Sequence, residues 1–146
     1  MLQRQHEYAT LAINAGISAG TDITGFGLAG HLLEMLEASH TSAQLQLETI
    51  PTLPGASEAI ASGIQSSLAP SNRMAAAKMD SQTSIRQDPY YDLLFDPQTC
   101  GGLLLGIPDA HLDELQSAIA ASQLRALVRI GTVVASKDPR RPLTVS

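Results

Sequence analysis

The sequence has little with which to build disulfides, zinc sites or aromatic surfaces. It contains one cysteine, no tryptophan, three tyrosines and two phenylalanines among 146 residues. A single thiol cannot close an internal disulfide, and no Cys-x-x-Cys spacing is present for a structural zinc ion. The scarcity of aromatic residues disfavours a surface that stacks nucleic-acid bases. The core is therefore expected to be aliphatic.

Basic residues are also few. Nine Lys and Arg stand against 14 Asp and Glu, which gives a formal net charge of −5. Proteins that bind nucleic acid through its phosphates carry the opposite balance, so nucleic acid is not expected as a partner. A nucleotide held through a metal ion remains compatible with this charge, because the metal bridges carboxylates to phosphates.

Long apolar runs are absent as well. No stretch approaches the length that spans a bilayer, and the N-terminus has no apolar signal core. We therefore expect a cytoplasmic protein that does not contact membranes. Apolar residues make up 44% and charged residues 16% of the chain. Such a composition and length predict one globular domain over residues 1–146, with a linker-like tail over residues 136–146.

The apolar pattern alternates between helical and strand periods along the chain. Helices are expected over about residues 5–17, 26–38 and 89–95, with others opening at 54–58 and at Asp109. Strands are expected over residues 44–48, 103–107 and 128–134, and residues 63–84 are expected to form a loop with a short helix. Helices that alternate with buried strands predict an α/β domain in which helices layer on a sheet.

Three finer expectations follow from this pattern. The continuous apolar run 103–107 suits a strand that is covered on both faces. Asp109 is placed to cap the helix that follows it. Phe26 is expected to belong to the apolar stripe of the second helix.

The stretch Thr21-Asp22-Ile23-Thr24-Gly25-Phe26-Gly27 is the first candidate for chemistry. Its glycines allow a sharp turn and a close approach of the backbone to another group. A carboxylate held at such a turn can orient a hydrated cation and the anion that the cation neutralises. The alternative is that Asp22 and Thr24 cap the following helix and the glycines serve only the turn.

A second Gly-containing loop, Asp96-Pro97-Gln98-Thr99-Cys100-Gly101-Gly102, precedes the expected strand 103–107. It can present Gln98 and Thr99 to a bound polar group, or it can simply reverse the chain. Cys100 is the only thiol. No Lys or Arg lies close to it in sequence to activate a nucleophile, so the favoured interpretation is a small packing residue.

Together the two stretches resemble motifs in the C-terminal domain of selenophosphate synthetases, which belong to the superfamily of aminoimidazole ribonucleotide synthetase. Two positions depart from the family pattern, since Ile23 replaces Val and Cys100 replaces Ser. The resemblance implies a mixed β-sheet layered with helices. It also implies that Asp22 is a Mg²⁺ ligand. The residues expected to form the ATP-binding loops are Thr24, Gly25, Gly27, Gln98, Thr99, Gly101 and Gly102.

The same resemblance implies a function. The family converts ATP, selenide and water to selenophosphate, AMP and phosphate, with its catalytic Cys or selenocysteine in an N-terminal domain. This chain would supply part of the Mg-ATP site and no catalytic residue, and would be inactive alone. A homodimer is expected.

Two alternatives remain open. One is the C-terminal domain of another member of the superfamily, such as aminoimidazole ribonucleotide synthetase. The other is a non-catalytic dimerisation or regulatory module. His31, which also matches the family pattern, is expected to hydrogen-bond the preceding turn rather than to shuttle protons.

Overall fold

A two-stranded ribbon and a four-stranded mixed sheet organise the chain in the computed structural model, which describes residues 5–136 and 138–146. The antiparallel ribbon consists of β1 (Ala19–Asp22) and β4 (Leu103–Gly106). The sheet has the order β3 (Met79–Ser81), β6 (Leu143–Val145), β2 (Thr41–Leu45), β5 (Gly131–Ala135). β2 pairs antiparallel with β5 and parallel with β6, which pairs parallel with β3.

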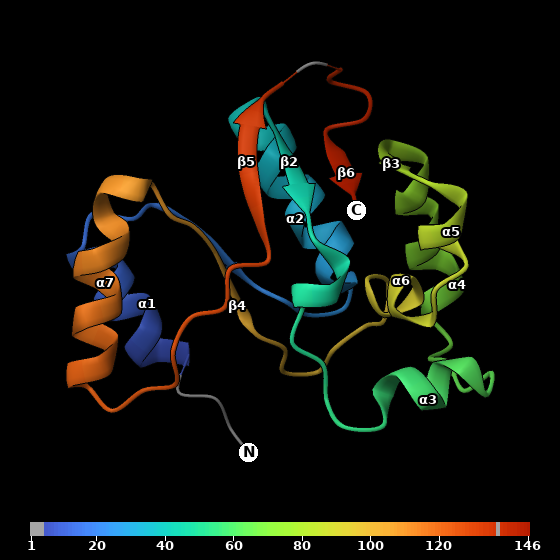
Figure 1. Cartoon of the computed structure of the whole chain (residues 1–146), viewed down its shortest axis with the longest axis horizontal. Coiled ribbons are helices and arrows are strands. Elements are labelled where there is room, and N and C mark those ends of the chain that lie inside the picture. Colours follow the sequence, from blue (N-terminus) through green and yellow to red (C-terminus); the bar gives the residue numbers. More distant parts are fainter. Residues whose placement is uncertain (1–4, 137) are drawn as a thin grey trace.

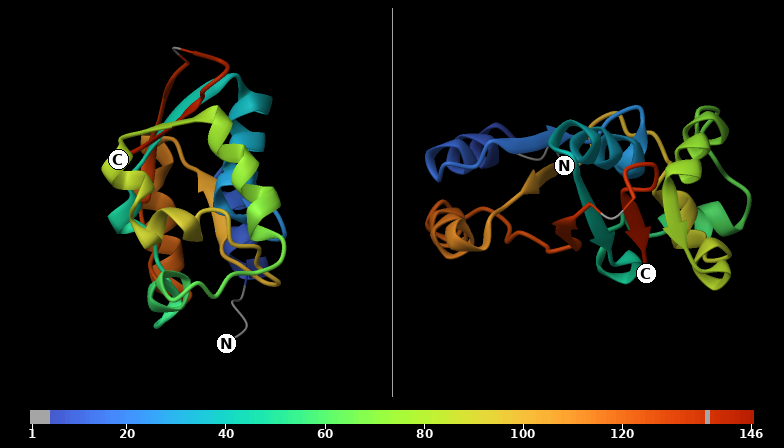
Figure 2. Two further views of the ribbon diagram at one scale, coloured as in Figure 1. Left: turned by 90° about the vertical axis from the view of Figure 1, so that its right-hand side faces the viewer. Right: turned by 90° about the horizontal axis from the view of Figure 1, so that it is seen from above.

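The helices divide among three parts of an elongated molecule (Figures 1 and 2). The α-helices are α1 (Gln5–Asn14), α2 (Gly27–Ser39), α3 (Ala56–Ala61), α4 (Ala69–Asn72), α5 (Thr83–Arg86), α6 (Pro89–Leu93) and α7 (Asp109–Ala121), and the 3₁₀ helices are η1 (Leu47–Thr49) and η2 (Arg73–Lys78). α1 and α7 lie at one end, α2 covers the sheet in the middle, and α3 to α6 lie at the other end. The expected α/β fold is confirmed.

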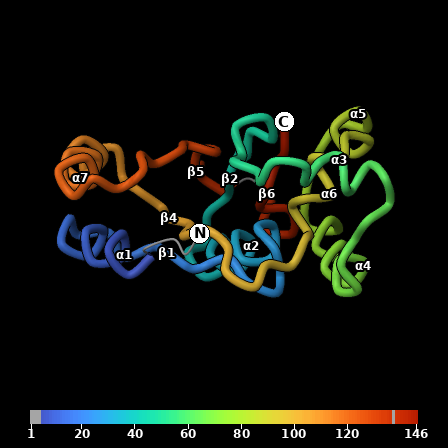
Figure 3. The backbone as a smooth tube through the Cα atoms, turned by 90° about the horizontal axis from the view of Figure 1, so that it is seen from below, coloured from blue at the N-terminus to red at the C-terminus, as the bar shows by residue number. Residues whose placement is uncertain are grey.

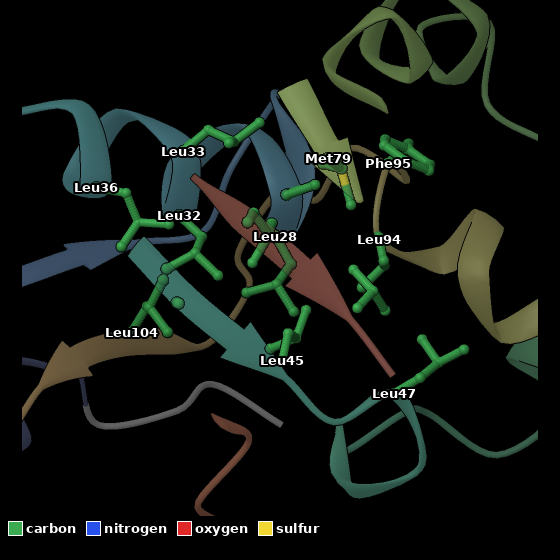
Figure 4. Packing of buried hydrophobic residues seen from close by; sticks show 14 of the residues in the cluster. Leu28, Leu32, Leu33, Leu36, Leu45, Leu47, Met79, Leu94, Phe95 and Leu104 are labelled. Carbon is green, nitrogen blue, oxygen red and sulfur yellow. The ribbon is translucent and has the colours of Figure 1, made fainter. Parts of the chain in front are cut away.

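The main core lies between α2 and the four-stranded sheet (Figure 4). Leu28, Leu32 and Leu36 recur at a spacing of four residues, which places them on one face of α2. All three are buried, and Leu45 of β2 and Leu143 of β6 are buried in the same cluster. Burial of each such side chain contributes about 1.5–3 kcal/mol, so this interface fixes the position of α2 on the sheet.

A second, smaller core joins the first helix to a helix of the C-terminal third, α7. α1 and α7 run side by side, as the views in Figures 1 and 3 agree. Ala12 packs there with Leu115 and Ile119, which are the buried residues of α7. The predicted helices at 5–17 and after Asp109 are therefore confirmed as elements.

The last strand differs from expectation. Residues 136–146 were expected to form a tail, yet Leu143–Val145 is an interior strand, with Leu143 0% and Val145 2% exposed. The expectation is wrong for these three residues. The prolines and charges that precede the strand gave the segment a linker-like composition, whereas the partners that bury it lie far away in the sequence.

Other local expectations are corrected by the tertiary structure. Phe26 is 58% exposed and lies just before α2 rather than in its apolar stripe. Asp109 is the first residue of α7 and does not cap it. Among the described strands β4 pairs only with β1, and it is mostly half-buried, so it is not covered on both faces.

Strand boundaries also shift. β2 begins at Thr41, before the alternating stretch that indicated a strand, and β5 begins only at Gly131. β3 was not predicted at all; it is three residues long and lies in the segment expected to be loop.

Among the described residues, no helix has the length and apolar character needed to cross a bilayer.

Candidate functional site

The two glycine-containing motifs meet because β1 and β4 are antiparallel. The end of β1 lies beside the start of β4, with Asp22 opposite Leu103. The motif that follows β1 and the motif that precedes β4 must therefore emerge at the same end of the ribbon. The pairing continues beyond the strands, since the Ile23 amide donates to the Gly102 carbonyl at 2.9 Å and the Gly101 amide donates to the Ile23 carbonyl at 3.1 Å.

Further backbone bonds join the motifs into one unit. The Thr24 carbonyl accepts hydrogen bonds from the Gln98 amide at 3.0 Å and from the Gly27 amide at 3.1 Å. The Ala29 amide donates to the Leu94 carbonyl at 2.9 Å. The start of α2 is thus bonded directly to the segment that leads into the second motif.

Two of the four motif glycines are required by internal packing. Gly27 has φ +70°, and a Cβ on it would lie 2.8 Å from the Leu94 carbonyl oxygen. A Cβ on Gly101 would lie 2.5 Å from the Ile23 carbonyl oxygen. No ordinary side chain fits these contacts, so both glycines let one motif approach the other.

The other two motif glycines, Gly25 and Gly102, are not required by internal packing. A Cβ added at Gly25 or at Gly102 would meet nothing within 4 Å, and neither residue has a positive φ. Gly25 is exposed and Gly102 is half-buried. Their open surroundings leave room for a group from outside the chain to approach the backbone closely.

Asp22 ends β1 with an exposed side chain. The residue that precedes α2 is Phe26, and no side chain caps this helix, so the interpretation of Asp22 and Thr24 as helix caps is wrong. Within the part of the chain that the structure describes, the Asp22 carboxylate has no hydrogen bond or ion pair. It is available to a ligand.

This carboxylate fits Mg²⁺ only as one ligand among several. Mg²⁺ is usually held by one or two carboxylates together with water and phosphate oxygens. Across residues 5–136 and 138–146, no three His, Cys, Asp or Glu side chains converge on a metal position. Asp22 therefore belongs to no cluster of three such ligands among the described residues.

His31 has the structural role expected from the sequence. It is 8% exposed, and its Nε2 lies 3.1 Å from the Thr24 hydroxyl oxygen in the preceding turn. Its Nδ1 lies 3.3 Å from a carboxylate oxygen of Glu34. The Phe26 ring packs against the imidazole with a centroid distance of 5.6 Å. Thr24 therefore helps to hold the turn.

The second motif presents side chains of two kinds. The side chain of Gln98 folds back toward Gly101, whereas Thr99 and Cys100 are exposed. The interpretation of Cys100 as a packing residue is therefore wrong. The apolar run that follows the cysteine indicated a buried environment, yet of the residues in β4 only Leu104 is buried.

Sequence reasoning missed the contribution of α4 and η2. Asn72 donates hydrogen bonds to the carbonyls of Gly25 and Phe95, one in or beside each motif. The next residue, Arg73, forms an ion pair with Asp92 and lies over the rings of Tyr91 and Phe95. The sequence neighbours of Asn72 gave no signal, since the segment has little apolar periodicity.

A cavity of about 130 Å³ adjoins the second motif. Its lining includes Arg73, Asp92 and Asp96, together with Phe95 and Ala69. Burial raises the pKa of the Asp96 carboxyl above its ordinary value. Asp96 thus differs from Asp22, since Asp96 is half-buried and Asp22 is exposed.

The fold and this junction of motifs define a class of domain. Residues 1–143 match the family described as AIR synthase related protein, C-terminal domain, and the chain belongs to this family.

Three of its relatives are selenide, water dikinases. The protein from Yersinia pseudotuberculosis is 40% identical over 144 residues, which covers 98% of this chain and 40% of the relative. The protein from Enterobacter sp. (strain 638) is 34% identical over 140 residues, 96% of this chain and 39% of the relative. The protein from Nitratidesulfovibrio vulgaris (strain DP4) is 37% identical over 106 residues, 73% of this chain and 30% of the relative.

These relatives confirm the resemblance to selenophosphate synthetases. Each is much longer than the present chain, which spans only 30–40% of their lengths.

Proposed function

We propose that residues 1–146 form the C-terminal domain of an ATP-dependent selenophosphate synthetase and supply part of its Mg-ATP site. The selenide, water dikinase relatives and the shared domain family support this assignment. The parent protein would convert ATP, selenide and water to selenophosphate, AMP and phosphate. The chain spans a minority of each relative, and the family resemblance implies that the catalytic Cys or selenocysteine would lie in an N-terminal domain.

The observation that carries the proposal is the exposed carboxylate of Asp22 at the junction of the two motifs, which has no partner among the described residues. Beside it, Thr24 and Gly27 shape a turn whose backbone at Gly25 is open. On the second motif, Thr99 is exposed and Gly102 is open. A triphosphate carries several negative charges, and a carboxylate can approach it only through a cation.

Each residue has a defined part in this proposal. Asp22 would hold Mg²⁺, and the bound ion would neutralise phosphate charge. Gly25 and Gly102 would admit the nucleotide close to the backbone, and Thr99 would offer its hydroxyl. Gly27, Gly101 and Gln98 would keep the two loops in register. The chain would position the nucleotide and leave the group transfer to the rest of the protein.

Several properties of the parent protein follow from this proposal. The chain alone is expected to be inactive, and the parent is expected to be a cytoplasmic homodimer. Phe26, exposed beside Gly25, is a suitable contact for the N-terminal domain, since an apolar ring in solvent gains free energy when it is covered.

The experiment compares Asp22→Asn with the native residue in the longest protein that carries this chain. ATP-dependent formation of selenophosphate should fall by at least about tenfold to a hundredfold, because a metal site loses a charged ligand. Asp113→Asn is the matched control, since Asp113 is an exposed carboxylate on α7. Titration calorimetry with Mg²⁺ and a non-hydrolysable ATP analogue should show weaker binding for Asp22→Asn alone.

Three results would count against the proposal. Equal activity and equal heats for Asp22→Asn and Asp113→Asn would remove Asp22 from the site. Selenophosphate formation by the chain on its own would show that no other domain is needed. ATP-dependent activity on another substrate, with none on selenide, would favour a different member of the superfamily.

A further inference from the structure

One side chain outside both motifs bonds to the first motif and to the residue immediately before the second. Asn72 is the last residue of α4, and its Nδ2 donates to the Gly25 carbonyl at 2.8 Å and to the Phe95 carbonyl at 3.0 Å. Gly25 lies in the first motif, and Phe95 immediately precedes the second. A carboxamide nitrogen carries two hydrogens, so both bonds can form at once.

The Gly25 turn has little else to hold it on this side. Apart from its chain neighbours, no described atom lies within 4 Å of a Cβ added at Gly25, so nothing packs on that side of the residue. On either side of this turn, Thr24 contacts His31, and Gly27 packs closely against the Leu94 carbonyl. Gly25 itself is fixed through its carbonyl, by Asn72.

α4 is in turn anchored to α6. The guanidinium of Arg73 pairs with Asp92 and lies 5.7 Å from the ring centroids of both Tyr91 and Phe95. An arginine held over aromatic rings and paired with a carboxylate has little rotamer freedom left to lose. Asn72 therefore reaches the two motifs from a fixed base.

We propose that Asn72 is a positioning residue for the nucleotide site, which sets the Gly25 turn at a fixed spacing from the loop that begins at Phe95. It acts through the backbone of the two motifs and does not touch the reacting atoms. Its effect on ATP use rests on the proposed function. Its coupling of the two loops is a property of this chain and can be tested without any activity.

The first test measures amide hydrogen exchange in the whole chain. Asn72→Asp and Asn72→Leu both remove the donors, one with an added charge and one without. Asn14→Asp and Asn14→Leu are the matched controls, because Asn14 is the only other asparagine and is exposed. The amides of Gly27 and Gln98 should exchange roughly tenfold faster in both Asn72 variants, as expected for loss of two hydrogen bonds.

The amides of α7 show whether the Asn72 variants only destabilise the whole fold. α7 packs in the separate core with α1, so loosening of the two motifs should leave its exchange unchanged. Uniformly faster exchange in α7 and in the motifs would show general destabilisation and would overturn the proposal. Unchanged exchange at Gly27 and Gln98 would overturn it as well. Asn72→Gln, which keeps the donor group, should show a smaller change than Asn72→Leu.

The second test measures kinetics in the longest protein that carries the chain. Asn72→Leu should raise the KM for ATP by roughly tenfold and leave the KM for selenide unchanged, because the loops that hold the nucleotide lose their spacing. An active native protein with equal ATP kinetics in the Asn72 and Asn14 variants would overturn the proposal. A native protein that makes no selenophosphate from ATP would instead contradict the proposed function, and hydrogen exchange would still decide the role of Asn72 in this chain.

Discussion

Gly27 lies so close to the Leu94 carbonyl that a Cβ on Gly27 would be 2.8 Å from this oxygen, and its φ is +70°. The same position would bring the Cβ within 2.9 Å of the Phe95 carbonyl carbon. The start of α2 and the approach to the second motif are therefore in backbone contact, and a side chain at this point would separate them.

Gly27→Ala is expected to lower the free energy of unfolding by about 2 kcal/mol or more, because it combines an unfavourable φ with a backbone clash. Urea unfolding followed by circular dichroism measures this. Gly25→Ala is the control, since its Cβ would be in open space, and it should change stability by about 0.5 kcal/mol or less. Similar unfolding midpoints for the two variants would contradict the assigned roles.

Thr24→Val is expected to destabilise the chain by about 1 kcal/mol, because the buried His31 ring loses its hydroxyl partner at 3.1 Å. Thr99→Val removes a hydroxyl from an exposed residue of the second motif and should have little effect on stability. Thermal unfolding of both variants provides the comparison. A Thr24→Val protein as stable as Thr99→Val would show that the contact with His31 contributes nothing.

Asp96→Asn is expected to stabilise the chain at neutral pH. Burial raises the pKa of Asp96 above its ordinary value of 3.8. The folded state therefore favours the protonated acid, and this stabilisation is complete below the ordinary pKa and is lost as the pH rises through the raised one. The advantage of Asp96→Asn over the native chain should accordingly disappear in acid.

Urea unfolding at several pH values between about 3.5 and 7 tests this, with Asp113→Asn as the exposed control. Arg73 and Asp92 line the same cavity as Asp96 and must stay unchanged in all variants. An Asp96→Asn chain that is less stable than the native chain at neutral pH would show that the ionised carboxylate makes a favourable contact that outweighs its burial.

Leu143→Ala is expected to cost about 2–5 kcal/mol, because Leu143 is 0% exposed in the interior strand β6 and the change leaves a cavity. Leu53→Ala removes the same atoms from a side chain that is 80% exposed, and should have a small effect. Chemical unfolding of the two variants measures the difference. Equal stability would mean that the last strand is dispensable, as its composition suggested.

Local pattern predicted most of the helices because each carries its own periodicity. The recurrence of Leu28, Leu32 and Leu36 determines the buried face of α2 whatever lies against it. Pro89 begins α6, and the Asp88 side chain caps it by accepting a hydrogen bond from the Tyr90 amide. Such signals are local in the sequence, so they survive without knowledge of the fold.

The short strands lacked such signals. β3 and β6 are three residues long; they pair with each other and β6 also pairs with β2, and their buried residues belong to the core that α2 covers. Three residues hold too few alternations to reveal a period. The exposure of Phe26 and Cys100 was equally hidden, since it depends on which faces the other elements cover.

The sequence alone determined the class of this protein. Its two motifs, around Asp22 and around Gln98, are recognised by residue types and spacing, which do not depend on the fold. Only the tertiary structure decided what each motif residue does. It separated Gly27 and Gly101, which internal contacts require, from Gly25 and Gly102, which are open. It also showed that Asn72 bonds to the backbone of Gly25 and Phe95. The physical reason is that hydrogen bonds and steric contacts depend on distances in space, and the antiparallel pairing of β1 with β4 brings together residues that the chain keeps far apart.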